Sequence, residues 1–358
     1  MKISLGKMYV DDAIRQAVIE VLESGQYVKG ENGQNFEREF ANFCGTKYAI
    51  GVSSGTSAIL LSLKAIDLRE NDEVIVPSHT FIATASPVKF LGATPIYADI
   101  DPDIYTIDPA DIKRRITPKT KAIIPVHLYG HPCDMDAILD IARQHDLCII
   151  EDACQAHGAE YKGKKVGGIG DIGCFSFFPS KNMTVLGEGG MVVTNDETVA
   201  ERISALRDHG RRQKYIHEML GLNLRLSEIH AAIGRQQLKH VEEWNAKRRT
   251  IAAHYNTSLR NLNNVITPLE REWAKHVYHL YVIRTEQRDK LAAHLQREGI
   301  ATGIHYPVPV HKQPCMESEA YLPITEKCAS QVLSLPMHPQ LTEDEVEYIC
   351  DKIRGFWR

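Results

Sequence analysis

The 358-residue sequence has little net charge. Its 42 lysines and arginines face 46 aspartates and glutamates, which leaves a formal net charge of −4. A protein that binds nucleic acid or an anionic membrane through its charge needs an excess of basic residues. The composition gives no support for either partner, so we expect a small-molecule ligand and, as a protein partner, a second copy of the chain.

Long apolar runs and paired cysteines are also missing. No stretch approaches the roughly 20 apolar residues that a membrane-spanning helix needs, and residues 1–18 lack the order of a signal peptide. The eight cysteines are scattered without a CxxC pair, which favours reduced thiols over disulfides or a zinc site. We therefore expect a cytoplasmic protein without a metal centre.

What the sequence does contain, between about residues 45 and 195, is an alternation of short β-rich runs and helical patterns. The β-rich runs lie at 48–52, 72–78, 94–100, 121–128 and 147–153, and helical patterns lie at 11–25, 56–66 and 135–146. Strands that alternate with helices of this length predict a parallel sheet covered by helices. The expected fold class is α/β, with a three-layer α/β/α large domain.

The pattern changes after residue 195. A long charged helical stretch at 226–259 is followed by one clear strand at 276–284, a helix at 288–299 and a segment rich in proline and histidine at 305–315. This order predicts a large domain over residues 1–240, which includes the N-terminal helical segment. A smaller C-terminal α+β domain is expected over residues 241–358.

One predicted strand end resembles a phosphate site, because ligands of an open parallel sheet bind beyond the carboxyl ends of its strands. After the run at 48–52, Gly55 permits close approach of the backbone. Thr56 and Ser57 place hydroxyl and N–H groups at the start of a helix, where phosphate binds. Taken alone, the same residues also fit an ordinary capped helix.

Two further strand ends bring an acid and a lysine. Asp152 ends an apolar strand, where it could bind a metal, act as a base, neutralise a cationic ring or cap a helix. Lys181 stands between aromatic and glycine-rich runs, as either a lysine that reaches toward water or a neutral amine that forms an imine. Together, a phosphate cradle, an acid and an imine-forming lysine predict pyridoxal 5′-phosphate as cofactor.

Seven segments also resemble, in order and nearly end to end, the family of DegT-type sugar aminotransferases. These segments are 51–66, 73–101, 125–138, 149–196, 221–238, 305–314 and 333–346. The family belongs to the aspartate aminotransferase fold group of pyridoxal phosphate enzymes. The resemblance therefore implies that fold, with a mostly parallel sheet, and a cofactor that alternates between pyridoxal and pyridoxamine 5′-phosphate.

The resemblance implies a role for each matching residue. Lys181 matches the lysine that binds the cofactor covalently, and Asp152 matches the carboxylate that keeps the pyridine nitrogen protonated. The remaining cofactor positions are Gln155 beside the ring hydroxyl, Phe81 on the ring, and Gly55, Thr56 and Ser176 at the phosphate. Asn223 matches an asparagine that reaches the phosphate from the partner subunit, which implies a homodimer with shared active sites, and Arg225 is a candidate for substrate binding.

The activity implied by the resemblance is transfer of an amino group from L-glutamate to a keto sugar. The sugar would be a nucleotide-linked 3-keto or 4-keto deoxyhexose, used for surface polysaccharide, lipopolysaccharide or glycosylated metabolites. The position stays open, because residues 153–159 resemble relatives that act at C3, while residues 188–196 also occur among those that act at C4.

Other activities remain possible at this point. A cyclitol ketone or a keto-acid sugar is an alternative acceptor, and a pyridoxal phosphate-dependent dehydratase or a non-catalytic regulator is an alternative function. Relatives that dehydrate sugars carry histidine where this chain has Lys181, which favours transamination.

The C-terminal motifs add candidates for the rim of the substrate pocket. His305 and Tyr306 begin the segment rich in proline and histidine, and loops of this kind carry function more often than regular elements do. The segment 208–215 contains basic residues that could contact substrate phosphates, although such a segment is more often a solvated loop.

Overall fold

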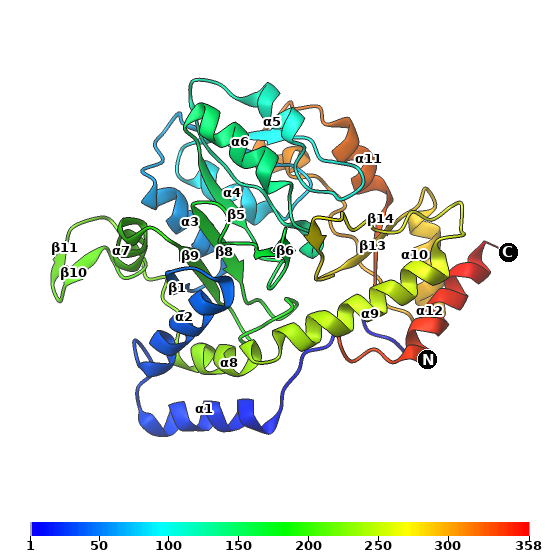
Figure 1. Ribbon diagram of the computed structural model, residues 1–358, viewed down its shortest axis with the longest axis horizontal. Coiled ribbons are helices and arrows are strands. Elements are labelled where there is room, and N and C mark those ends of the chain that lie inside the picture. The colour runs from blue at the N-terminus through cyan, green and yellow to red at the C-terminus, as the bar shows by residue number, and fades with distance from the viewer. Residues whose placement is uncertain (1, 358) are drawn as a thin grey trace.

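The computed structural model describes residues 2–357, and its centre is a seven-stranded sheet (Figure 1). In spatial order the strands are β1 (Tyr48–Val52), β9 (Gly190–Thr194), β8 (Ile172–Ser176), β5 (Cys148–Asp152), β4 (Thr120–Ile123), β2 (Glu73–Pro77) and β3 (Thr94–Ala98). All run in one direction except β9, which is antiparallel to both of its neighbours. The carboxyl ends of the other strands therefore share one edge of the sheet.

Side chains alternate between the two faces of the sheet. Val74 and Val76 of β2 pack into one hydrophobic cluster with α3 (Gly55–Ala65), α4 (Ser86–Phe90) and α7 (Glu197–Leu206). Ile75, between them, packs on the opposite face with α5 (Pro109–Arg115) and α6 (Met135–His145). On that face, α2 (Glu31–Cys44) and α8 (Glu228–Leu238) cover β8 and β9. The result is a three-layer α/β/α arrangement.

The N-terminal helix α1 (Asp12–Ser24) lies beneath α8, at the bottom of the molecule in Figure 1. The side chain of Asp11 caps it by accepting a hydrogen bond from the Ile14 N–H, and it ends at Gly25 with a φ of +67°. A left-handed residue after a helix is a common stop, and glycine adopts it without strain. The helix predicted over 11–25 is confirmed.

The C-terminal part forms a separate hydrophobic cluster. It contains α9 (Val241–Leu259), α10 (Arg288–Arg297), α12 (Glu343–Phe356) and the antiparallel pair β13 (Tyr281–Arg284) and β14 (Val332–Leu335), with α11 (Pro323–Gln331) leading into β14. Ile3, near the N-terminus, joins this cluster through a bridge to Ile300. The first residues of the chain thus pack against its last helices.

The fold class expected from the sequence is confirmed, with local differences. The helical stretch at 226–259 is two helices, α8 and α9, interrupted at Lys239 and His240, and the strand expected at 276–284 begins only at Tyr281. Val310 and Met316 pack into the main cluster of the large sheet. No helix within residues 2–357 is long and apolar enough to cross a membrane.

Candidate active site

A cavity of about 380 Å³ lies beyond the carboxyl ends of β1, β5 and β8. It is lined by residues from separate segments, which include the predicted site residues Gly55, Thr56, Phe81, Asp152, Gln155, Ser176, Lys181 and Tyr306. Because parallel strands end at one edge, residues far apart in the sequence meet there.

Helix α3 points its N-terminus at this cavity. Neither Gly55 nor Thr56 has an acceptor for its backbone N–H within residues 2–357, as expected in the first turn of a helix. A Cβ on Gly55 would lie 2.8 Å from Cys154 Sγ and 2.8 Å from Ser176 Cβ. The position therefore requires glycine, and the helix end offers unpaired donors to an anion.

Ser57 differs from the expectation that it binds phosphate. Its N–H donates to Ser54 Oγ at 3.1 Å, and its hydroxyl lies 2.9 Å from Ser54 Oγ and 2.8 Å from Ser53 Oγ. Ser57 does not line the cavity. Its polar groups are already used in capping α3, so the free backbone donors at this helix end are those of Gly55 and Thr56.

Asp152 is a buried carboxylate, 5% exposed, at the end of β5. Its Oδ2 accepts a hydrogen bond from Thr84 Oγ1 at 2.8 Å, and its Oδ1 accepts one from the Cys154 N–H at 3.2 Å. The next element after Asp152 in the chain is the strand β6 (Glu160–Tyr161) and not a helix, so Asp152 is not a helix cap. In the described part of the chain, no three His, Cys, Asp or Glu side chains gather as a metal site. Asp152 therefore presents a buried, oriented carboxyl group to the cavity.

Gln155 and Tyr306 close the cavity toward the C-terminal part. Gln155 Oε1 accepts a hydrogen bond from the Tyr129 N–H at 2.8 Å, and its Nε2 donates to the Tyr306 hydroxyl at 3.1 Å. The rings of Phe81 and Tyr306 lie 5.7 Å apart, and Phe81 is 53% exposed. Phe81 and Tyr306 therefore form an aromatic wall of the cavity that contains Asp152.

Lys181 lies in the loop after β8, and its neighbour Asn182 holds that loop in place. Asn182 Nδ2 donates to Asn245 Oδ1 at 2.9 Å and to the Val277 carbonyl at 3.1 Å. The Lys181 amine has no hydrogen bond or ion pair to any residue from 2 to 357. Burial lowers the pKa of Lys181, while Cys154 and Asp152 oppose that shift. A partly buried, unpaired amine of this kind is a competent nucleophile.

These residues fit pyridoxal phosphate. Unpaired N–H groups at the start of α3 and the hydroxyls of Thr56 and Ser176 suit a phosphate, and the missing Cβ of Gly55 lets this helix end lie against Cys154 and Ser176. Asp152 would face the pyridinium nitrogen with a carboxylate, and Lys181 would supply the amine that binds the cofactor. The fold and the site together define a pyridoxal phosphate-dependent enzyme of the aspartate aminotransferase fold group.

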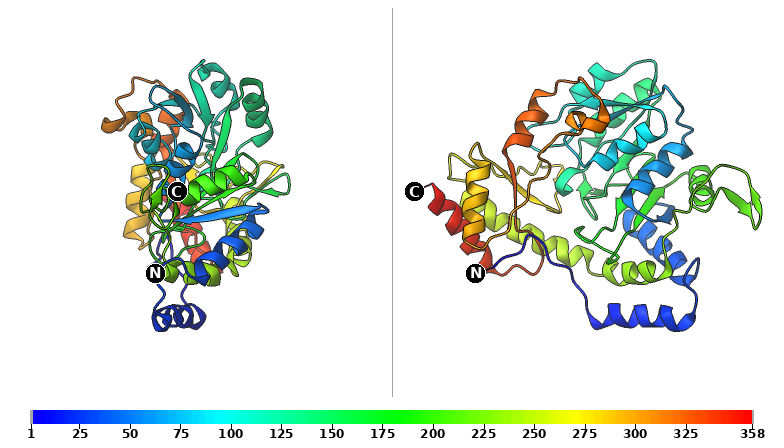
Figure 2. Two further views of the ribbon diagram at one scale, coloured as in Figure 1. Left: turned by 90° about the vertical axis from the view of Figure 1, so that its left-hand side faces the viewer. Right: turned by 180° about the vertical axis from the view of Figure 1, so that it is seen from behind.

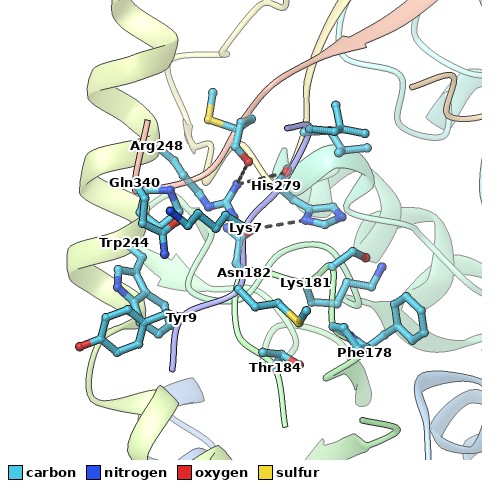
Figure 3. Close-up of a pocket in the computed structure, with 18 of the residues that line it drawn as sticks. Lys7, Tyr9, Phe178, Lys181, Asn182, Thr184, Trp244, Arg248, His279 and Gln340 are labelled. Carbon is cyan, nitrogen blue, oxygen red and sulfur yellow. Dashed lines mark hydrogen bonds between the residues drawn. The ribbon is translucent and has the colours of Figure 1, made fainter. Parts of the chain in front are cut away.

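A second cavity, of about 420 Å³, lies on the other side of Lys181 (Figure 3). The N-terminal segment 5–9, helix α9 and the segment that contains His305 line it, and both Lys181 and Tyr306 face both cavities. The Nδ1 atom of His305 lies 2.8 Å from Ser334 Oγ. His305 and Tyr306 therefore lie where a substrate would approach the lysine.

Asn223 and Arg225 lie outside both cavities of their own chain. Asn223 is exposed and forms a backbone bridge with Asp208, and the Arg225 guanidinium is paired with the Asp208 carboxylate. Nearby, the hairpin of β10 (Arg211–Gln213) and β11 (Ile216–His217) carries the basic segment and projects from the body of the molecule (Figure 2). Asn223, Arg225 and this hairpin do not line either of the cavities that contain Lys181 of the same chain.

The chain matches the family model described as the DegT/DnrJ/EryC1/StrS aminotransferase family over residues 9–354. It is therefore a member of that family. It is 46% identical over 342 residues to a dTDP-3-amino-3,4,6-trideoxy-alpha-D-glucose transaminase of Streptomyces venezuelae, with 94% of this chain and 90% of the relative covered.

Two further relatives extend the similarity. A UDP-N-acetyl-3-dehydro-alpha-D-glucosamine 3-aminotransferase of Acidithiobacillus ferrooxidans is 43% identical over 345 residues, with 96% of this chain and 93% of the relative covered. The crystal structure of S. venezuelae DesV in complex with a ketimine intermediate superposes with a TM-score of 0.97 at 43% identity, covering 99% of this chain and 98% of DesV.

Several residues of the site could not be found from the sequence. Thr84 and Asn245 act through hydrogen bonds to residues 68 and 63 positions away, and no local pattern marks such contacts. Arg248 and the segment 5–9 line the second cavity only because the N-terminus folds back onto α9. Arg248 lies in a charged helical stretch, where the sequence alone predicts a solvent-exposed arginine.

Proposed function

We propose that this protein transfers the amino group of L-glutamate to a keto sugar linked to a nucleoside diphosphate. The observation that carries the proposal is the unpaired amine of Lys181, which faces a cofactor-sized cavity on one side and an open substrate-sized cavity on the other. Family membership supplies the reaction class, and the aminotransferase relatives supply the substrate class.

Each residue of the first cavity has a proposed task. Gly55, Thr56 and Ser176 bind the phosphate, and Asp152 holds the pyridine nitrogen protonated, with Thr84 fixing its carboxylate. The proposed ring contacts are Gln155 and Phe81. Pyridoxal phosphate supplies the carbonyl carbon and electron-withdrawing ring that carry the amino group between substrates. Lys181 binds the cofactor and moves the proton at the donor α-carbon, a task that suits an amine of lowered pKa.

The ketone is proposed to lie at C3 of the sugar. Two relatives of 43% identity or more are named for an amino or keto group at that position, one on a dTDP sugar and one on a UDP sugar. Residues 153–159 resemble the same group of enzymes. The product would be an amino sugar for surface polysaccharide, lipopolysaccharide or a glycosylated metabolite.

The active unit is proposed to be a homodimer in the cytoplasm, with a domain boundary near residue 240. Asn223 is exposed beside apolar side chains that a monomer would leave in water, among them Tyr27, Val28, Ile216, Leu220 and Leu222. A partner subunit would cover this surface and receive Asn223 at its phosphate site. All eight cysteines are free thiols, which suits a reducing compartment.

The spectrum of the pyridoxal phosphate-loaded protein tests the proposal. L-glutamate is expected to remove the visible absorption band with stoichiometric release of 2-oxoglutarate, and a 3-keto dTDP or UDP sugar is expected to restore it. Lys181→Ala should abolish the band, whereas Lys164→Ala, at an exposed position outside both cavities, should not. A band that is unaffected by every amino donor would refute the transaminase assignment.

A further inference from the structure

The second cavity has an unusual charge balance. Its lining includes three basic side chains, Lys7, Lys181 and Arg248, but no aspartate or glutamate. His279 and His305 also face it, and burial lowers the pKa of both, so they are neutral near pH 7. Nothing in the lining balances the positive charge, and an unbalanced charge in a partly enclosed space is costly without an anion.

Arg248 is a deeply buried member of this set, with 5% of its surface exposed. Its Nη1 donates to the carbonyl groups of Met337 at 2.8 Å, Tyr278 at 3.2 Å and His279 at 3.3 Å. Its Nε is buried without a hydrogen-bond partner, and within residues 2–357 the guanidinium has no carboxylate partner. The edge formed by Nε and Nη2, which is the edge that binds carboxylates in two-pronged fashion, is left unsatisfied.

Lys7 contributes a second cationic side chain from the N-terminal segment. It is exposed and forms no ion pair within residues 2–357, and Figure 3 shows its side chain extending toward Arg248 and Gln340. In the same view, Arg248 and Lys181 lie on opposite sides of the cavity. Apolar side chains, among them Leu5, Met8, Trp244 and Met337, line the space. A ligand that starts at Lys181 therefore passes apolar walls before it reaches a cationic end.

We infer that Arg248 and Lys7 bind the distal carboxylate of a dicarboxylate amino donor, and so select it over amino acids that lack that group. The inference rests on the proposed transaminase function. A donor whose α-amino group reacts beside Lys181 would place its methylene chain along the apolar walls and its terminal carboxylate at the cationic end. A planar guanidinium edge forms two parallel hydrogen bonds with a carboxylate, and because phosphate can be bound in the same way, the test below compares glutarate with inorganic pyrophosphate.

A comparison of two amino donors tests the inference. L-norvaline has the same chain length as L-glutamate but no distal carboxylate. The reaction with each donor is followed by the loss of the visible band in a single turnover. Arg248→Lys should lower kcat/KM for glutamate by about 10- to 100-fold, as expected for a lost charge-assisted hydrogen bond. The value for norvaline should change little. Arg249→Lys, the adjacent arginine paired with Glu270 outside the cavity, is the matched control.

Lys7→Met tests the inference even if Arg248→Lys fails to fold, because Lys7 is exposed and its substitution should not disturb the core. It should weaken glutamate selectively by about two- to fivefold, as for one exposed charge pair. Lys247→Met is its control, because Lys247 is an exposed lysine of α9 that pairs with Glu243 and does not line the cavity.

Direct binding gives a readout that is independent of turnover. Glutarate, added to the pyridoxal phosphate-loaded protein, should bind with an affinity that both Arg248→Lys and Lys7→Met reduce, as measured by calorimetry. Equal losses for glutamate and norvaline, or variants that weaken inorganic pyrophosphate instead of glutarate, would overturn the inference. If wild type reacts with glutamate, such a result leaves the transaminase assignment intact; if wild type reacts with no donor, that assignment fails instead.

Discussion

Lys181 and Asp152 face the same cavity, yet their surroundings differ in the hydrogen bonds that they provide. Asp152 receives hydrogen bonds from Thr84 and from the Cys154 N–H, which stabilise its carboxylate. Lys181 has no such partner, and its burial favours the neutral amine. One side chain is therefore fixed in orientation at the cavity, while the other is left without a partner and free to react.

The first prediction concerns that anion. Asp152→Asn keeps the shape but removes the charge, so we expect pyridoxal phosphate to bind about 10- to 100-fold more weakly and turnover to fall with it. Thr84→Val, which removes one hydrogen bond to the carboxylate, should show a smaller loss of about three- to tenfold. Spectroscopic titration with the cofactor measures both.

Asp196→Asn is the control for this pair. Asp196 caps α7 away from the cavity, and asparagine caps helices as well as aspartate does. If Asp152→Asn bound the cofactor as tightly as this control, Asp152 would have no role at the ring nitrogen.

At the scale of elements, the junction of β1, α3 and β8 depends on a residue without a side chain. Gly55 begins α3, where Cys154 and Ser176 leave no room for a Cβ. The close approach of these three segments is what brings the helix N-terminus to the sheet edge. A larger residue there would separate the segments and displace the unpaired N–H groups at the start of α3.

Gly55→Ala should therefore be harmful twice over. We expect a loss of about 1–3 kcal/mol in the free energy of unfolding from overpacking, and weaker binding of pyridoxal phosphate. Denaturant unfolding with and without cofactor measures both effects. Gly355→Ala, in α12 with no atom within 4 Å of the added Cβ, should instead be neutral or stabilise the protein by up to about 1 kcal/mol. Equal behaviour of the two variants would contradict the packing argument.

The elements that were predicted correctly are those with a strong local pattern. The run at 48–52 matches β1, and 147–153 contains β5, because apolar runs bounded by turn residues mark buried strands in any α/β protein. The reversed direction of β9 was not predicted. It follows a connection from β8 that contains no crossover helix, and the sequence does not say where that loop returns.

Missed elements divide into those with a readable signal and those without one. The start of α12 carries a capping box, in which Thr342 and Glu345 bond reciprocally, and this signature was available in the sequence. β14 is four residues long and is stabilised by its pairing with β13, which no local pattern reveals. The site residues divide in the same way. Gly55, Asp152 and Lys181 could be found because they follow predicted strands, whereas Thr84 and Asn245 could not, because their hydrogen bonds join residues far apart in the sequence.

For the whole molecule, buried neutral histidines make the fold sensitive to acid. Burial lowers the pKa of His79 to about 4, of His131 to about 4 and of His157 to about 3, from an ordinary value of 6.5. Between pH 6.5 and 4 the unfolded chain binds protons that the folded chain does not, so stability is full above pH 6.5 and falls as the pH drops. At pH 5 each histidine should cost on the order of 2 kcal/mol.

Urea unfolding between pH 7.5 and 5 measures this loss. His157→Leu removes one of these buried groups and should make the pH dependence shallower by about one proton. Neither ring nitrogen of His157 has a hydrogen-bond partner, so the substitution breaks no hydrogen bond. His145→Gln, at an exposed position at the end of α6, should leave the slope unchanged. A wild-type slope of zero across this range would rule out the buried histidines as the acid-sensitive groups.

Site sharing between subunits is a property of the assembled molecule, and mixed dimers can test it. Lys181→Ala and Asn223→Ala should each be inactive or severely impaired alone. In a mixed dimer, the site that keeps Lys181 would receive an intact Asn223 from the other chain, so random mixing should restore about one quarter of wild-type activity. Mixing Lys181→Ala with Asp152→Asn is the matched control, because both residues line the same cavity of one chain and every site in that mixed dimer stays defective. Recovery in the first mixture but not in the second requires Asn223 to act across the interface, whereas no recovery in either places its function within its own chain.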